Sequence, residues 1–202
     1  MDKFEGVKKV ELTTEKALQM LEEFRRKTED TNWIDHSICV GNSAGKIAEK
    51  LGLDVEKAKT LGYIHDIGKG IGGFLEHPQN GYQYIKQGGY ADEYANVCLT
   101  HSFLNNDYMC TIGWLPEENV DLSNFIQTHE YTIYERIINL CDMICTNVNV
   151  TLEKRLIDIM IRRGIFENTI YFVKEIQKLK KGFDNMLGFN IYTLFPDILD
   201  NE

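Results

Sequence analysis

The sequence has little proline and no long apolar run. Only three prolines interrupt its 202 residues, and long stretches carry helical periodicity, which favours an α-rich fold because proline breaks helices. No stretch approaches the roughly 18 apolar residues of a membrane span. The first residues, MDKFEGVKKVELTTEK, lack the apolar segment of a secretory signal. We therefore expect a cytoplasmic protein that does not associate with a membrane.

Acidic residues outnumber basic ones, and the cysteines are not closely paired. The net charge of −9 argues against a nucleic-acid coat or an anionic membrane as the main partner. It leaves a phosphate-bearing substrate open, because a metal ion supplies local positive charge. The five cysteines form no CxxC pair, which predicts reduced thiols. Cys141 and Cys145 would share a helix face, and we expect buried small hydrophobes rather than ligands.

Periodicity and capping residues predict one helical domain spanning residues 1–202. Asn32 and Asp54 suit helix starts, Thr151 caps a later helix, and Gly52 and Gly164 suit helix ends. The helices are expected at about 13–29, 32–52, 55–67, 77–88, 91–103, 131–147, 152–163 and 169–187. Residues 190–202 are expected to pack loosely.

Residues 102–129 show no clear periodicity. A connection of this length is usually disordered or functional. Its large apolar residues, such as Phe103 and Trp114, argue for packing, so we expect a lid over a site.

Histidines carry the first chemical signal. His36, His65 and His101 lie on or beside apolar helix faces. A lone histidine of this kind is more often an ordinary core residue, but several together are costly to bury unless they share a metal ion. The adjacent pair His65-Asp66 can turn inward together only if a cation offers each residue a ligand position. Asp142, in the apolar context INLCDMIC, also needs neutralisation.

Four segments resemble the HD superfamily. The order His36, His65-Asp66, Asp142 resembles its H…HD…D pattern, and GYIHDIGKG resembles the HDIG subset. EHPQNGYQYI and NVCLTHSF are similar to further elements of HD-GYP-like phosphodiesterases, and YERIINLCDMI resembles the final aspartate helix. The resemblance covers residues 32–147. It implies an all-α HD-domain helical bundle on which the helix at 13–29 and the extra C-terminal helices at 152–187 pack.

The resemblance also implies roles for individual residues. His36, His65, Asp66 and Asp142 would hold a first divalent metal ion, and Asp66 would bridge to a second. His77 and His101 would hold that second ion, and Lys69 would contact phosphate or support the attacking hydroxide, unless it is a solvated loop lysine. The cofactors are then one or two ions of iron, manganese, zinc or magnesium, which all accept nitrogen and carboxylate ligands.

The chain departs from HD-GYP proteins where it has His101-Ser102 instead of two histidines, and it lacks the GYP stretch. Water, phosphate or His129 could complete the second site. His129 is therefore a candidate ligand or catalytic acid, or else a capping residue. Small bacterial HD hydrolases of diadenosine tetraphosphate resemble the chain in size and in having extra histidines.

Four basic residues follow the last motif. They could reach a polyphosphate or sugar phosphate, or they could be solvated cations that suit a helix end. These residues are Lys154, Arg155, Arg162 and Arg163.

The sequence thus predicts a metal-dependent phosphohydrolase or phosphodiesterase that uses metal-activated water on a nucleotide or other small phosphate ester. Two alternatives stay open. One is a regulatory module that binds a nucleotide without turnover, and the other is an HD-fold di-iron oxygenase. A homodimer also stays open.

Overall fold

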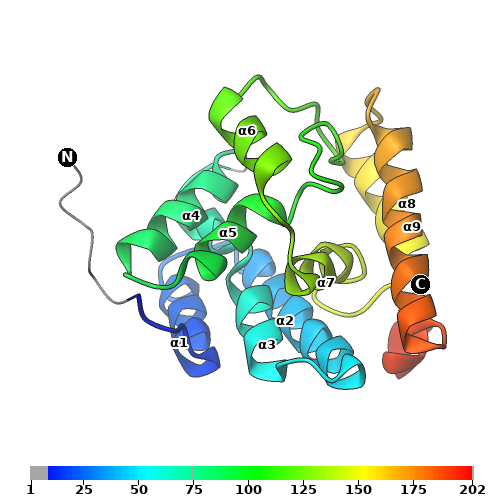
Figure 1. The fold of residues 1–202 in the computed structure, drawn as a ribbon, viewed down its shortest axis with the longest axis horizontal. Coiled ribbons are helices and arrows are strands. Elements are labelled where there is room, and N and C mark those ends of the chain that lie inside the picture. Colours follow the sequence, from blue (N-terminus) through cyan, green and yellow to red (C-terminus); the bar gives the residue numbers. More distant parts are fainter. Residues whose placement is uncertain (1–8, 74, 202) are drawn as a thin grey trace.

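The computed structural model describes residues 9–73 and 75–201. Figure 1 shows the described part as an assembly of helices without a sheet. The α-helices are α1 (Thr14–Arg25), α2 (Asn32–Leu51), α3 (Val55–Ile64), α4 (His77–Gln87), α5 (Asp92–Thr100), α6 (Val120–Thr128), α7 (Ile133–Asp142), α8 (Leu152–Arg163) and α9 (Thr169–Leu187). The 3-10 helices are η1 (Ile67–Gly70), η2 (Ile191–Leu194) and η3 (Pro196–Ile198). The all-α fold class is confirmed.

Helix α7 lies at the centre of the fold. It contacts α2, α3 and α5 on one side and α9 on the other, and Figure 1 shows α8 and α9 standing beside it at the right of the bundle. Its start is fixed by a capping box, in which Thr132 and Glu135 bond each other's backbone N–H groups. A site at the end of α7 is therefore enclosed by helices from both halves of the chain.

Two glycines allow α2 and α3 to cross closely. A Cβ on Gly62 would lie 2.4 Å from the Cα of Gly41, and a Cβ on Gly41 would lie 2.2 Å from the ring of Tyr63. Any larger residue would push these helices apart. The crossing matters for function because α2 carries His36 and α3 leads into His65 and Asp66.

The region expected to lack periodicity contains a helix, α6. The side chain of Asn119 accepts a hydrogen bond from the backbone N–H of Leu122 and so caps it. Leu122 and Ile126 then pack against Leu99 and Phe103 in a small second core. This helix was missed because only two of its nine residues are buried, which leaves a weak apolar stripe.

Some predicted helix ends and one predicted tail were wrong. Helix α1 stops at Arg25, and Thr31 rather than Asn32 is the N-cap of α2, while Asp30 accepts the Asn32 N–H. The expected loose packing of residues 190–202 is contradicted as well. Ile191, Phe195 and Ile198 are buried in the main core, because η2 and η3 turn their apolar side chains inward.

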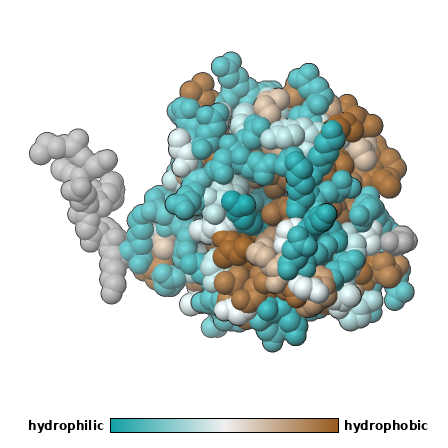
Figure 2. All heavy atoms as spheres, turned by 45° about the vertical axis from the view of Figure 1, so that its right-hand side comes forward, coloured by the Kyte–Doolittle hydropathy of each residue, from teal (hydrophilic) through white to brown (hydrophobic). Residues whose placement is uncertain are grey.

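The cysteines and the surface follow ordinary patterns. All five cysteines are free, and Cys141 and Cys145 are buried as predicted. They do not share a helix face, because α7 ends at Asp142 and Cys145 lies beyond it. Among the described residues, no helix has the length and apolarity needed to cross a membrane. Figure 2 brings the α8–α9 side forward and shows hydrophilic residues intermixed with hydrophobic ones. Ile157 and Ile161 are the exposed apolar residues of α8.

Candidate metal centre

Asp66 lies where α3 gives way to η1, and each of its carboxylate oxygens faces a different pair of histidines. Oδ2 lies 3.5 Å from Nε2 of His65 and 3.8 Å from Nε2 of His36. Oδ1 lies 3.2 Å from Nε2 of His77 and 3.4 Å from Nε2 of His101. Asp66 therefore belongs to both groups of buried side chains that could hold a metal ion.

The first group comes from α2 and the end of α3, with Asp142 added from the end of α7. Oδ1 of Asp142 lies 2.8 Å from Nε2 of His36 and 3.9 Å from Nε2 of His65. His36, His65 and Asp66 are buried, whereas the side chain of Asp142 is 21% exposed. Asp142 thus closes the group on the side that solvent reaches, and it is less buried than its apolar context suggested.

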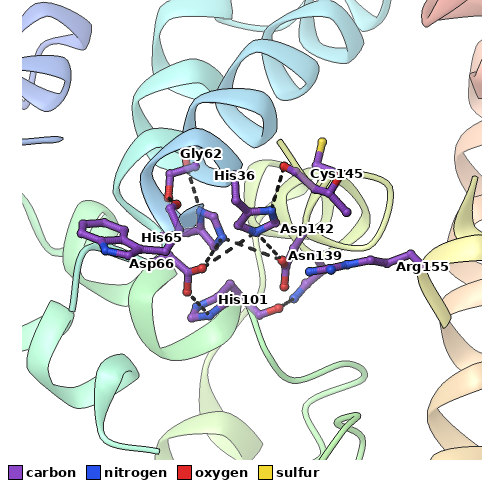
Figure 3. Close-up of polar contacts among 12 residues, drawn as sticks. His36, Gly62, His65, Asp66, His101, Asn139, Asp142, Cys145 and Arg155 are labelled. Carbon is purple, nitrogen blue, oxygen red and sulfur yellow. Dashed lines mark hydrogen bonds and ion pairs between the residues drawn. The ribbon is translucent and has the colours of Figure 1, made fainter. Parts of the chain in front are cut away.

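The second group comes from α4 and the end of α5. Nε2 of His77 lies 3.1 Å from Nε2 of His101, and both imidazoles are buried. The structure therefore brings the six expected ligands together at Asp66, from four helices and the turn after α3. Figure 3 labels all of them except His77, with His36, His65 and His101 around Asp66 and with Asp142 beside His36.

The hydrogen bonds of three imidazoles show which ring nitrogen carries no proton. Nδ1 of His36 contacts the carbonyl of Thr146 at 3.3 Å, and Nδ1 of His65 contacts the carbonyl of Gly62 at 2.7 Å. Nδ1 of His101 contacts the carbonyl of Val97 at 3.2 Å. Because a carbonyl only accepts, each Nδ1 carries the proton, and a neutral ring then turns a lone pair on Nε2 toward the aspartates.

A lone pair that faces a carboxylate is unfavourable unless a cation lies between them. Nε2 of His65 and Oδ1 of Asp66 are both buried without a hydrogen-bond partner, which is rare among buried polar atoms. Nitrogen and carboxylate donors with a backbone-fixed tautomer are the arrangement that divalent metals use in proteins. The residues present therefore fit divalent metal ions.

Burial sets the charge state of these groups. It lowers the pKa of His65 to about 3 and also lowers the pKa of His77, so both rings are neutral near pH 7. Burial works against ionisation of Asp66, but the positive charge of Lys69 outweighs it and holds the pKa of Asp66 well below its usual value. The pKa of Asp142 is lowered too, since its contact with His36 outweighs burial. Neutral imidazoles and ionised carboxylates are the forms that bind metal ions.

Local sequence features hold the two groups together. A Cβ on Gly68 would lie 1.9 Å from the carbonyl oxygen of His77, so glycine in the HDIGKG stretch lets η1 pack directly on the start of α4. Asn139 of α7 donates from its amide to the carbonyls of Thr100, His101 and Phe103. These contacts fix the end of α5, and with it His101, against α7, and Asn139 is a positioning residue that sequence analysis missed.

A small recess opens beside Asp66 and Asp142. It encloses about 60 Å³, room for only a few water molecules, whereas ligand pockets usually have roughly 300–1,000 Å³. Lys69 pairs with Asp66 at its edge. Helix α8 and the segment 111–114 form the opposite side, with Thr111, Ile112, Trp114, Arg155, Ile159 and Arg163 among the lining residues.

The other candidates divide between this recess and the surface. Arg155 and Arg163 line the recess, but Lys154 binds the carbonyl of Asn201 and Arg162 pairs with Asp158. The ring of His129 stacks on Phe125, and its Nε2 lies 2.8 Å from Oε1 of Glu135. Neither group of potential metal ligands contains His129. From the region 102–129, Thr111, Ile112 and Trp114 line the recess, and the expectation of a lid stays a prediction.

The family can be decided by comparison with known proteins. The model of the HD domain family matches residues 33–147, more than half of the chain. This chain belongs to the HD domain family. That superfamily comprises metal-dependent phosphohydrolases, and the matched residues contain all six expected ligands. Helices α8 and α9 lie outside the match.

Individual relatives match shorter parts of this chain than the family model does. Ribonuclease Y of Fervidobacterium nodosum is 42% identical over 72 residues, which is 35% of this chain and 14% of the ribonuclease. Ribonuclease Y of Mycoplasma mycoides is 58% identical over 40 residues, 20% of this chain and 10% of the relative. The chain thus matches only a small part of the length of these relatives.

Among solved structures, the HD domain of the phosphodiesterase PgpH of L. monocytogenes aligns with a TM-score of 0.45 and 16% identity. The alignment covers 84% of this chain and 95% of the PgpH domain.

Proposed function

We propose that this HD domain is a phosphohydrolase or phosphodiesterase with two divalent metal ions as cofactors. His36, His65, Asp66 and Asp142 would hold the first ion, and Asp66, His77 and His101 the second. The observation that carries this proposal is the position of Asp66, which turns one oxygen toward each pair of histidines. A carboxylate between two such groups suits a bridging ligand.

Metal ions held there would activate water at neutral pH and draw charge from the phosphate oxygens. The chain's own residues orient the reactants around that chemistry. The ammonium group of Lys69, at the edge of the recess beside Asp66, would contact a non-bridging phosphate oxygen as a point charge. The segment 111–114 would exclude bulk water from the recess, which strengthens these electrostatic contacts.

The substrate class we propose is a small phosphate ester, with a nucleotide as the leading candidate. The ribonuclease Y relatives favour a phosphodiester, since RNA is one. Against a polynucleotide stand the net charge of −9 and the small recess, because RNA-binding proteins normally offer an extended basic groove.

The test combines elemental analysis of protein purified without chelator with phosphate release from a panel of nucleotides. We expect about two metal ions per chain and turnover that chelation removes and manganese or iron restores. Lys69→Met should keep both ions but slow hydrolysis about 10- to 100-fold, the effect of one lost charged hydrogen bond. Absence of turnover in the metal-loaded protein would instead favour a regulatory module.

A further inference from the structure

One face of α8 places two arginines opposite the metal centre. Arg155, Ile159 and Arg163 follow each other at four-residue intervals and all line the recess that also contains Asp66 and Asp142. Figure 3 shows the side chain of Arg155 reaching from α8 toward Asn139 and Asp142. Nothing in the HD domain match assigns these arginines, because the match ends before α8 begins.

The acidic residue beside these arginines on α8, Asp158, is engaged by Arg162. Asp158 binds Arg162 through both of its oxygens, at 2.9 and 2.6 Å, and lies 3.6 Å from Nη1 of Arg155. Nε of Arg155 is buried and has no hydrogen-bond partner. Burial lowers the pKa of Arg163, and the neighbouring Arg162 and Arg155 add to this effect, so its positive charge is partly shielded from water. An anion in the recess would accept a hydrogen bond from Nε of Arg155 and would lie beside the positive charge of Arg163.

Arg163 is half-buried and packs against the segment that contains Gly113. Gly113 has a φ of 82°, and a Cβ there would lie 2.7 Å from Cδ of Arg163 and 3.1 Å from Cγ2 of Ile159. The amide of Asn168 donates to the carbonyls of Met109, Thr111 and Trp114 and so holds this segment over α8. Arg163 is therefore a component of the recess and not a surface cation.

We infer that Arg155 and Arg163 form a second anion subsite, and that the substrate carries a further phosphate close to the scissile one. The inference rests on the proposed function and deepens it. Guanidinium groups bind phosphate oxygens through paired N–H donors, which suits a phosphate better than a neutral group. The small volume of the recess requires the two phosphates to be near each other, as in a pyrophosphate or a compact bisphosphate.

The test is isothermal titration of the manganese-loaded protein with inorganic pyrophosphate and, separately, with inorganic phosphate. Metal content is measured after each titration, because pyrophosphate also binds free metal ions. The variants are Arg155→Met and Arg163→Met, which keep much of the side-chain volume. Lys154→Met is the matched control, since it removes a positive charge from the same turn but its amine binds Asn201 outside the recess.

Wild-type protein should bind pyrophosphate at least about tenfold more tightly than phosphate. Each arginine variant should weaken pyrophosphate binding by about tenfold or more and shrink the preference over phosphate, while Lys154→Met should match wild type. Equal affinities in wild type, or arginine variants that retain the preference, would overturn the inference.

Hydrolysis of bis(p-nitrophenyl) phosphate by wild-type protein separates this inference from the proposed function. Hydrolysis without an arginine-dependent preference for pyrophosphate would refute only the second subsite. An arginine-dependent preference in a metal-loaded protein that hydrolyses no ester would refute the proposed hydrolase and leave the anion subsite in place.

Discussion

The two walls of the recess are built differently. The first wall belongs to the metal centre, where three imidazoles donate to backbone carbonyls and so present a fixed nitrogen to the aspartates. Of these three, His101 lines the recess itself. On the other wall, arginine side chains of α8 lie under a segment held mainly by the amide of Asn168. The first construction fixes the orientation of the ligand nitrogens, as metal sites require, whereas the second places two positive charges beside the metal centre. We infer that the first wall sets the chemistry and the second selects the substrate.

The largest expected effect comes from the first wall. Asp66→Asn keeps the shape of the side chain but removes the charge that both groups of histidines share. We expect loss of most bound metal and a fall in hydrolysis on the order of 1,000-fold or more. Elemental analysis and phosphate release measure the two quantities in the same preparation. Full metal content with normal turnover would show that Asp66 is not a bridging ligand.

Lowering the pH should destabilise the metal-free protein, because ionisable residues of the first wall are held in their unprotonated forms by the fold. Burial depresses the pKa of His65 to about 3 from 6.5, so the unfolded chain binds more protons between these values. Stability is therefore full above about pH 6.5 and is lost as the pH falls toward 3, and the lowered pKa values of Asp66 and Asp142 extend the loss below about pH 4. For His65 the free energy of unfolding should fall on the order of 3 kcal/mol from pH 7 to pH 4.

Urea unfolding of chelator-treated protein at several pH values measures this dependence. His65→Asn should flatten the slope between pH 7 and pH 4. A wild-type stability that stays constant over this range would mean that His65 is not buried in its neutral form.

The next largest effect is expected at Gly68, where η1 packs on the start of α4 between the two groups of metal ligands. Gly68→Ala would place a Cβ against the carbonyl of His77 and the backbone N of Gly81, which should cost about 1–3 kcal/mol of unfolding free energy. It should also weaken the second metal position by shifting His77. Gly182→Ala is the control, because a Cβ there meets nothing within 4 Å in the interior of α9, and it should stabilise by about 0.5–1 kcal/mol. Thermal unfolding and metal titration distinguish the two variants.

The smallest effect is expected on the second wall. Asn168→Leu removes three amide hydrogen bonds from the segment 109–114, and we expect a loss of about 1–2 kcal/mol with unchanged metal content. Hydrogen exchange should quicken at residues 109–114. Metal loss in this variant would mean that the two walls are coupled and that the contrast between them is wrong.

The difference between the two walls explains which parts of the site the sequence could predict. The histidines and aspartates of the first wall stand in recognisable motifs on helices with clear ends, such as Gly52 after α2 and the N-cap Asp54 of α3. Arg155 and Arg163 were two of four basic candidates, and only the helix face that meets the recess separates them from Lys154 and Arg162. Asn168 holds carbonyls more than 50 residues away. No pattern of neighbouring residues in the sequence indicates a contact over such a distance along the chain.

Crystals of the protein grown with manganese would test the central claim most directly, through anomalous scattering measured at the metal edge. The account predicts two peaks on either side of the Asp66 carboxylate, about 3.5–4 Å apart, one beside His36, His65 and Asp142 and the other beside His77 and His101. A single peak that excludes His77 and His101, or no peak at Asp66, would contradict it.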